Sequence, residues 1–276
     1  MIYRQTIEGM RDGTEMQNMT SDLQTPSAPQ PSYSSRPDLT GQPYLTALGR
    51  MHSALSPETY LEIGVNEGAS LRLSKCATLA IDPDTSRLQD VIADKPTLFI
   101  FQMTSDAFFK TNDPRRLLGR EVDFAFIDGM HWSEYILRDF MNTERCGRRN
   151  SVIALHDCLP TNVYIAEREN DGARRRTMGA PENMWAGDGW KVMLILKKYR
   201  PDLHILALDA PPTGLVYVTN LDPTSTVLQD RYFDICREFE KTTLLDYGLD
   251  RYFEKMDVRS TREFARREDI SVRFHF

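Results

Sequence analysis

The chain has 276 residues, of which 41% are hydrophobic, so it can form one α/β domain with a substantial core and additional tails. Its 34 basic and 40 acidic residues give a net charge of −6. This balance argues against a nucleic-acid-binding surface, because such surfaces are normally basic. No stretch of about eighteen apolar residues occurs, so we expect no membrane-spanning helix.

The cysteines and the start of the chain bear on the cellular compartment. The four cysteines lie far apart and form no Cys-x-x-Cys pair, which excludes a disulfide framework and a zinc knuckle. Residues 1–19 carry scattered charges and no apolar centre, unlike a secretory signal. We therefore expect a cytoplasmic protein without a membrane partner.

Residues 1–42 are predicted to form a disordered N-terminal tail. The stretch 24–40 is rich in Pro, Ser and Gln and poor in aliphatic residues. Such a segment buries too little apolar surface to offset the entropy that ordering would remove.

From residue 43 onward, strand and helix patterns alternate. Strands are expected over residues 59–63, 78–81, 98–102, 122–127 and 151–155. Helices are expected over residues 44–55, 86–93 and 132–146, from 68 to 74, and over 105–118 with an interruption near 113–114. Strands that are apolar on both faces and are each followed by a helix predict a parallel sheet covered on both sides.

The second half begins with a long polar insert, residues 158–189, followed by a helix over 190–200. Two closing strands are expected over 203–208 and 214–219, and their short connection suits an antiparallel edge hairpin. After residue 220 the pattern is helical and charged, which predicts an extension that packs on the core or on a second subunit. Residues 270–276 are expected to form an extra strand or a tail.

Polar side chains follow every predicted strand of the parallel sheet. They are Asn66, Asp82, Ser105, Asp106, Asp128, His131, His156 and Asp157. In an open parallel sheet, ligands bind beyond the carboxyl ends of the strands. These residues are therefore the candidate site.

The first strand end has the features of a nucleotide-binding turn. Gly64 and Gly68 allow close backbone approach to a ligand. Asp82 follows eighteen residues after Gly64, at the next strand end, where a carboxylate can accept hydrogen bonds from ribose hydroxyls. A nicotinamide dinucleotide fingerprint would have a glycine in place of Asn66, so the match to that class is partial.

Glu62, an acid inside the end of a buried strand, is a further motif residue just before this turn. Glu62, Gly64 and Gly68 resemble the first, second and last conserved places of acid-x-Gly-x-Gly-x-Gly, the first motif of class I S-adenosylmethionine-dependent methyltransferases. The stretch 126–131, Phe-Ile-Asp-Gly-Met-His, followed by Tyr135 and Asp139, resembles a subgroup of small O-methyltransferases. The resemblance covers roughly residues 43–219.

This resemblance implies a fold, a cofactor and a set of binding residues. The fold is a Rossmann-like doubly wound sheet of seven strands, mostly parallel with an antiparallel edge strand, plus a C-terminal helical extension. The expected domains are the tail 1–42, a methyltransferase domain 43–220 and the extension 221–276. The expected residues that bind S-adenosylmethionine are Glu62, Gly64, Asn66, Gly68, Asp82, Ser105, Asp106 and Asp128.

The fourth and fifth strands are neighbours in that fold, so Asp128 and Asp157 end side by side. Two such carboxylates repel each other unless one is protonated or a cation lies between them. One interpretation is a divalent cation, Mg or Mn, held by Asp128, His156 and Asp157. A second makes His131 or His156 a general base assisted by Asp157. In a third, His156 or Asp157 only caps the following segment.

The insert 158–189 is expected to cover the acceptor. Met184, Trp185 and Trp190 could form an apolar wall, or the tryptophans could belong to the core. The arginine run 174–176 could meet an anionic group or could lie in solvent.

The expected function is S-adenosylmethionine-dependent O-methylation of a small molecule or a sugar. The alternatives are an NAD-dependent oxidoreductase and a non-catalytic donor-binding protein of the same fold. The expected partners are a small-molecule acceptor, no nucleic acid, and a second copy of the chain bound through the C-terminal helices.

Overall fold

The computed structural model describes residues 34–36 and 38–274. Most of the predicted N-terminal tail therefore lies outside the described residues. Its last residues contact the domain: the Arg36 N–H donates to the Thr161 carbonyl at 2.7 Å, and the Gly41 N–H donates to the Asp209 carbonyl at 3.1 Å.

A seven-stranded sheet with the order β3-β2-β1-β4-β5-β7-β6 forms the centre of the molecule. Its strands are β1 (Thr59–Ile63), β2 (Ala77–Ile81), β3 (Leu98–Phe101), β4 (Phe124–Ile127), β5 (Val152–His156), β6 (His204–Leu208) and β7 (Leu215–Thr219). Strands β1 to β5 pair in parallel, whereas β7 is antiparallel to both β5 and β6. The predicted fold class is confirmed, with the antiparallel strand lying just inside the edge strand β6.

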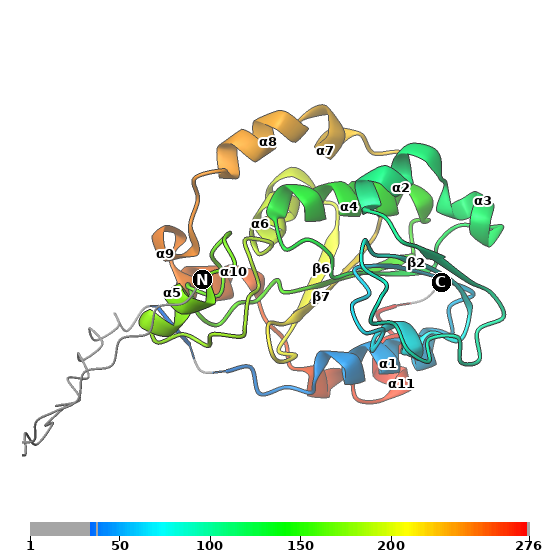
Figure 1. Cartoon of the computed structure of the whole chain (residues 1–276), viewed down its shortest axis with the longest axis horizontal. Helices are drawn as coiled ribbons and strands as arrows, with labels where there is room; N and C mark the ends of the chain where they lie inside the picture. Colours follow the sequence, from blue (N-terminus) through cyan, green and yellow to red (C-terminus); the bar gives the residue numbers. More distant parts are fainter. Residues whose placement is uncertain (1–33, 37, 275–276) are drawn as a thin grey trace, which may run out of the picture.

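Helices cover both faces of this sheet (Figure 1). One face carries α2 (Ser105–Thr111), α4 (Ser133–Cys146) and α6 (Lys191–Tyr199); the other carries α1 (Tyr44–Leu55) and α11 (Arg267–Ser271). Helix α3 (Pro114–Leu118) begins three residues after the end of α2, so the interruption expected near residue 113 is confirmed. Two apolar clusters, one under each helical layer, form the core.

Two expected helices are absent from the part of the chain that the structure describes. Residues 68–74 contain only the short 3₁₀ helix η1 (Leu71–Leu73), and residues 86–93 contain no helix. Asp90 and Ala93 have φ values of 50° and 43°. A right-handed helix cannot include such residues, so the helix expected over residues 86–93 is wrong.

The C-terminal extension is helical and packs on the core of the same chain. It contains α7 (Val227–Asp230), α8 (Tyr232–Phe239), α9 (Leu244–Tyr247), α10 (Leu249–Met256), the 3₁₀ helix η2 (Thr261–Phe264) and α11. The buried Tyr252 hydroxyl donates to the Cys158 carbonyl at 2.6 Å. Residues 267–271 are helical, so the extra strand expected from residue 270 is wrong for the described residues. A homodimer through these helices stays a prediction.

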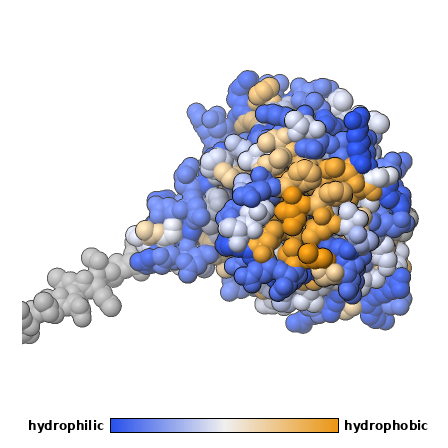
Figure 2. Space-filling model, turned by 45° about the vertical axis from the view of Figure 1, so that its right-hand side comes forward, coloured by the Kyte–Doolittle hydropathy of each residue, from blue (hydrophilic) through white to orange (hydrophobic). Residues whose placement is uncertain are grey.

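Strand β3 is an open edge of the sheet with an apolar surface. Ile100 on β3 is 41% exposed, and Ile92 in the preceding loop is 70% exposed. Figure 2 brings forward the side of the molecule that holds this edge and shows apolar side chains gathered in one patch.

Among the described residues, no helix is both long and apolar enough to cross a membrane.

Candidate functional site

A cavity of about 710 Å³ lies at the carboxyl ends of β1 to β5. The strand order reverses between β1 and β4, and ligands of open α/β sheets bind at this point. The lining comes from all five strand ends and from the insert: Gly64, Asn66, Asp82, Ser105, Asp106, Asp128, His131, His156, Asp157, Met184 and Trp185. The fold thus brings together nearly all the site residues expected from the sequence.

The turn after β1 shows why one glycine of the motif can be replaced. Gly64 has a φ of 84°, and a Cβ there would lie 2.1 Å from the Asp128 carbonyl oxygen, so this position requires glycine. Asn66 adopts φ 49°, a left-handed conformation that asparagine tolerates better than most residues. The Asp82 carboxylate accepts from the N–H groups of Val65 at 2.6 Å and Asn66 at 3.1 Å, which orders the turn.

Glu62 and Gly68 lie outside the lining of the cavity. The Glu62 carboxylate is fully buried and accepts from the Tyr60 hydroxyl at 2.7 Å and the Ser70 hydroxyl at 2.6 Å. Burial raises its pKa to about 8 although both hydrogen bonds favour the charged form. The donors that a buried acid needs therefore come from the protein interior rather than from a ligand.

Two carboxylates and two imidazoles form a polar cluster at the ends of β4 and β5. His131 Nε2 lies 3.2 Å from Asp157 Oδ2 and 3.6 Å from Asp128 Oδ1. His156 Nδ1 lies 3.2 Å from Asp128 Oδ1 and 3.4 Å from Asp157 Oδ2. Asp157 has a φ of 56°, and such backbone conformations concentrate at functional sites.

The charges of this cluster depend on one another. Burial alone would lower the pKa of both imidazoles, but Asp128 and Asp157 raise the pKa of His131 to about 9 and that of His156 well above its usual value. Burial likewise opposes ionisation of Asp128, yet His156 and His131 hold its pKa below the usual range. Asp128 and the two imidazoles therefore stabilise each other's charged forms in this arrangement.

The same cluster also fits a divalent cation. One ligand atom each from Asp128, His131 and Asp157 lies within 4.8 Å of the others. His131 Nδ1 lies 3.0 Å from the Trp185 carbonyl oxygen, which can only accept, so Nδ1 carries the proton and Nε2 faces the carboxylates. A second hydrogen bond of this kind orients most metal-binding histidines. The sequence pointed to His156 as the imidazole ligand, whereas the group with suitable geometry has His131 in its place.

Residues 61–158 match a family model described as a methyltransferase domain. This segment of the chain is therefore similar to a methyltransferase domain. The matched segment runs from β1 to just beyond β5 and so includes every strand end that lines the cavity. The resemblance inferred from the motif residues is confirmed over this segment.

Several solved structures are also similar to the chain. An S-adenosylhomocysteine (SAH)-bound methyltransferase from Podospora anserina is 14% identical, with 65% of this chain and 78% of that chain covered and a TM-score of 0.47. An O-methyltransferase from Bacillus cereus in complex with SAH is 15% identical, with 68% and 84% covered and a TM-score of 0.43. The O-methyltransferase TomG from Streptomyces achromogenes, in complex with SAM, is 14% identical, with 67% and 83% covered and a TM-score of 0.43. No curated protein matches the chain.

Two residues that the sequence did not single out contact the polar cluster at the ends of β4 and β5. The Tyr44 ring, at the start of α1, packs on the His156 imidazole with ring centroids 4.1 Å apart and an interplanar angle of 37°. The buried Thr213 hydroxyl donates to Asp157 Oδ1. Both lie outside the matched segment, and the only sequence signal for Tyr44 was an apolar helix position.

The insert contributes an aromatic wall to the cavity at the strand ends. Trp185 stacks on His131 with centroids 5.0 Å apart, and Met184 also lines the cavity. Trp190 instead is fully buried against Tyr252, so of the two alternatives for the tryptophans the core position holds for Trp190.

The arginine run of the insert does not line the cavity. Arg174 pairs with Glu167, and Arg176 pairs with Glu182. Arg175 is buried and donates to the Glu182 carbonyl at 2.8 Å. Arg174 and Arg176 thus pair with acids of the insert itself, Arg175 is held by uncharged acceptors, and none of the three lines the cavity.

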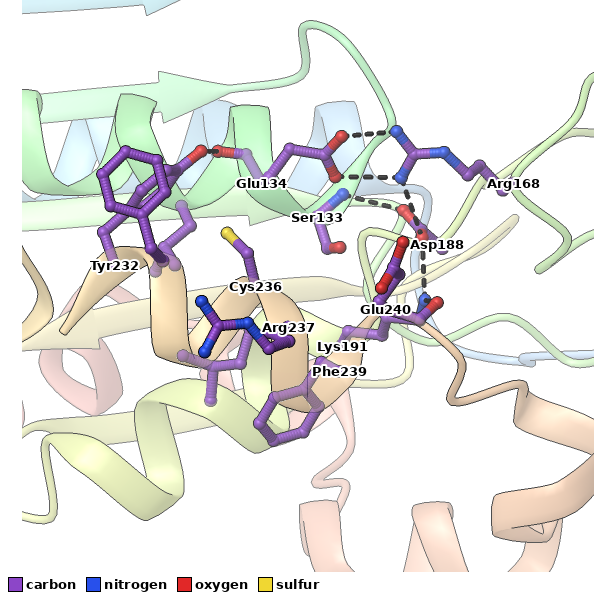
Figure 3. A pocket seen from close by; sticks show the side chains of 13 residues that line it. Ser133, Glu134, Arg168, Asp188, Lys191, Tyr232, Cys236, Arg237, Phe239 and Glu240 are labelled. Atoms are coloured by element: carbon purple, nitrogen blue, oxygen red, sulfur yellow. Dashed lines mark hydrogen bonds and ion pairs between the residues drawn. The ribbon is translucent and has the colours of Figure 1, made fainter.

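A second cavity, of about 610 Å³, lies between α4, α6 and α8 and carries none of the expected site residues (Figure 3). Its polar wall is centred on the buried Asp188. Asp188 Oδ1 accepts from the Ser133 N–H at 2.7 Å, and Oδ2 lies 2.9 Å from Lys191 Nζ and 3.3 Å from an Arg168 nitrogen. This network ties the insert to the helix that follows His131.

Proposed function

We propose that the chain is an S-adenosylmethionine-dependent methyltransferase that methylates a hydroxyl group of a small molecule or a sugar. The methyltransferase match supports methyl transfer over the hydride transfer of an oxidoreductase. The observation that carries the proposal is one cavity that joins the glycine turn after β1 to the polar cluster after β4 and β5. Its volume falls within the range of about 300 to 1,000 Å³ typical of small-molecule sites.

In this proposal the two ends of the cavity have different roles. Gly64, Asn66 and Asp82 bind the amino-acid and ribose parts of the donor, and Ser105 and Asp106 lie near its adenine. The acceptor binds between the polar cluster and Trp185. Methyl transfer is an in-line displacement, so the protein contributes mainly position and the exclusion of water.

For removal of the hydroxyl proton, the geometry favours a divalent cation held by Asp128, His131 and Asp157, with His156 beside them. Such a cation, when bound, lowers the pKa of a coordinated hydroxyl. The Trp185 carbonyl keeps His131 Nε2 directed at the carboxylates. Asp157 is held in turn by the Thr213 hydroxyl.

A histidine general base is the second candidate, because His131 Nε2 already faces the cavity and its tautomer is fixed. This route needs a neutral imidazole, whereas Asp128 and Asp157 raise the pKa of His131 to about 9. The cation is therefore the preferred proposal.

Donor binding tests the core of the proposal. Calorimetry should detect the binding of S-adenosylmethionine and of its demethylated product. Asp82→Asn should weaken the affinity for both ligands at least about tenfold. Asp84→Asn, on an exposed residue outside the cavity lining, should leave both affinities unchanged. Binding of NAD with no binding of either donor form would reverse the assignment. Donor binding without turnover of any hydroxyl acceptor would leave a non-catalytic protein.

Metal removal tests the cation separately. Chelation should abolish turnover, and added Mg²⁺ or Mn²⁺ should restore it. Asp157→Asn should weaken Mn²⁺ binding, measured by electron paramagnetic resonance without any acceptor. Full turnover in chelator, together with its loss in His131→Gln, would favour the histidine base.

A further inference from the structure

A groove of about 570 Å³ lies between α1, the end of η1 and α11, on the face of the sheet that α1 and α11 cover. Five of its lining residues are basic: Arg50, Arg72, Lys75, Arg266 and Arg267. None of its lining residues is acidic, and none is shared with the cavity at the strand ends. We call it the basic groove.

The positive charge of the basic groove is only partly neutralised. Among the described residues, the side chains of Arg50 and Arg267 have no hydrogen-bond or ion-pair partner. Lys75 Nζ lies 3.8 Å from Asp94, and both side chains are more than three-quarters exposed, so this pair is weak. Arg266 pairs with Asp269 at 2.9 Å.

Arg72 adds a cation whose partners carry no charge. It donates to the backbone carbonyls of Glu67 at 3.1 Å and Gln89 at 2.9 Å. These bonds fix the guanidinium in place but leave its charge uncompensated. The five cations therefore face the carboxylates of Asp94, Glu268 and Asp269, in a chain whose net charge is −6.

We propose that the basic groove binds a small molecule that carries two or more phosphate groups. Like charges gathered from three segments repel one another, and an anion that bridges them removes this repulsion. Four of the five cations are arginines, whose planar guanidinium groups match phosphate oxygens in pairs. The acidic chain as a whole repels a long nucleic acid, which favours a small anion at this local positive site.

The rest of the groove leaves room for an organic part of the ligand. Leu73 and Ile270 form an apolar floor, and Thr46 and Ser53 add hydroxyl groups. A free chain of phosphates and a nucleoside diphosphate present the same recognition chemistry. The two sources differ only in whether the organic part adds affinity.

Calorimetry on the full chain tests the proposal with inorganic phosphate, pyrophosphate, tripolyphosphate and uridine diphosphate. Affinity should rise with the number of phosphates and fall as salt increases. The double variant Arg50→Gln/Arg267→Gln should weaken tripolyphosphate binding at least about tenfold. Tighter binding of uridine diphosphate than of pyrophosphate would indicate a nucleotide, and equal binding would indicate a free phosphate chain.

The matched control is Arg145→Gln, because Arg145 is exposed at the end of α4, outside the basic groove. This variant should bind tripolyphosphate like the unaltered chain. The double variant should also keep its thermal unfolding midpoint, which shows that the fold survives. No saturable binding at millimolar tripolyphosphate, equal weakening in the control, or much tighter binding of single-stranded RNA would overturn the proposal.

Discussion

Tyr44 shows how one aromatic ring can organise a group of charged residues. Its ring covers a face of the His156 imidazole, while His156 Nδ1 lies between the two carboxylates. Burial, with a smaller contribution from Asp128, raises the pKa of the Tyr44 hydroxyl to about 12, so the hydroxyl stays neutral. We infer that Tyr44 is a positioning residue, which acts through His156.

Two substitutions of Tyr44 distinguish the contribution of its ring from that of its hydroxyl. Tyr44→Leu should lower kcat by about tenfold to a hundredfold, because His156 loses the surface that holds its ring and small displacements in a site are costly. Tyr44→Phe keeps the ring and should retain most of kcat. Donor affinity, measured by calorimetry, should be unchanged in both. Equal kcat in Tyr44→Leu and the unaltered chain would show that the contact has no role in turnover.

Single residues also show where a motif is informative and where it misleads. The motif placed Gly64 correctly, because a Cβ there would collide with the Asp128 carbonyl oxygen. It could not show that Asn66 would adopt the left-handed conformation without a glycine. Nor could it show that Glu62 faces the interior hydroxyls of Tyr60 and Ser70 rather than the cavity.

Among the larger elements, the insert 158–189 and helix α4 act together. Asp188 joins them, since its carboxylate caps the first N–H of α4 and neutralises the buried Lys191 ammonium (Figure 3). The neighbouring Gly187 packs so closely that a Cβ would lie 2.2 Å from the His131 carbonyl oxygen. The position of His131 therefore depends on the insert.

Removing this link should destabilise the fold. Asp188→Ala leaves the Lys191 ammonium buried without its carboxylate, and breaking a buried ion pair in this way costs about 3 to 5 kcal/mol. Urea unfolding followed by circular dichroism would measure the loss. The double variant Asp188→Leu/Lys191→Met removes both charges and should recover much of it. Arg237→Gln, at an exposed pair beside the same cavity, should change stability by less than about 0.5 kcal/mol.

For the molecule as a whole, His52 links the stability of the fold to pH. Its ring packs between Tyr60 and Phe124, with centroids 4.7 and 4.9 Å away, and neither ring nitrogen has a hydrogen-bond partner among the described residues. Burial, and then the nearby Lys95, lowers its pKa to about 3 from its ordinary 6.5. The folded state therefore holds His52 neutral.

Between pH 6.5 and 3 the unfolded chain binds a proton at His52 and the folded chain does not. The contribution of neutral His52 to the free energy of unfolding is therefore fully present above pH 6.5. Below pH 6.5 this contribution falls by up to about 1.4 kcal/mol per pH unit. His52→Leu should remove this part of the acid sensitivity in urea unfolding measured at pH 7, 6 and 5. His204→Leu, on an exposed histidine at the edge strand, is the matched control and should keep it. Parallel pH curves for the unaltered chain and His52→Leu would contradict the assignment.

The sequence alone determined the strands of the sheet and the acids at their ends. Short apolar runs between turn residues can be buried only as strands of a covered parallel sheet, and such strands place polar groups at one edge. The tertiary structure decided how these groups meet. It set His131 beside both carboxylates, brought Tyr44 and Thr213 to the same cluster, and gathered the basic groove from three distant segments. These contacts join residues far apart in the chain, and only packing decides which of them touch.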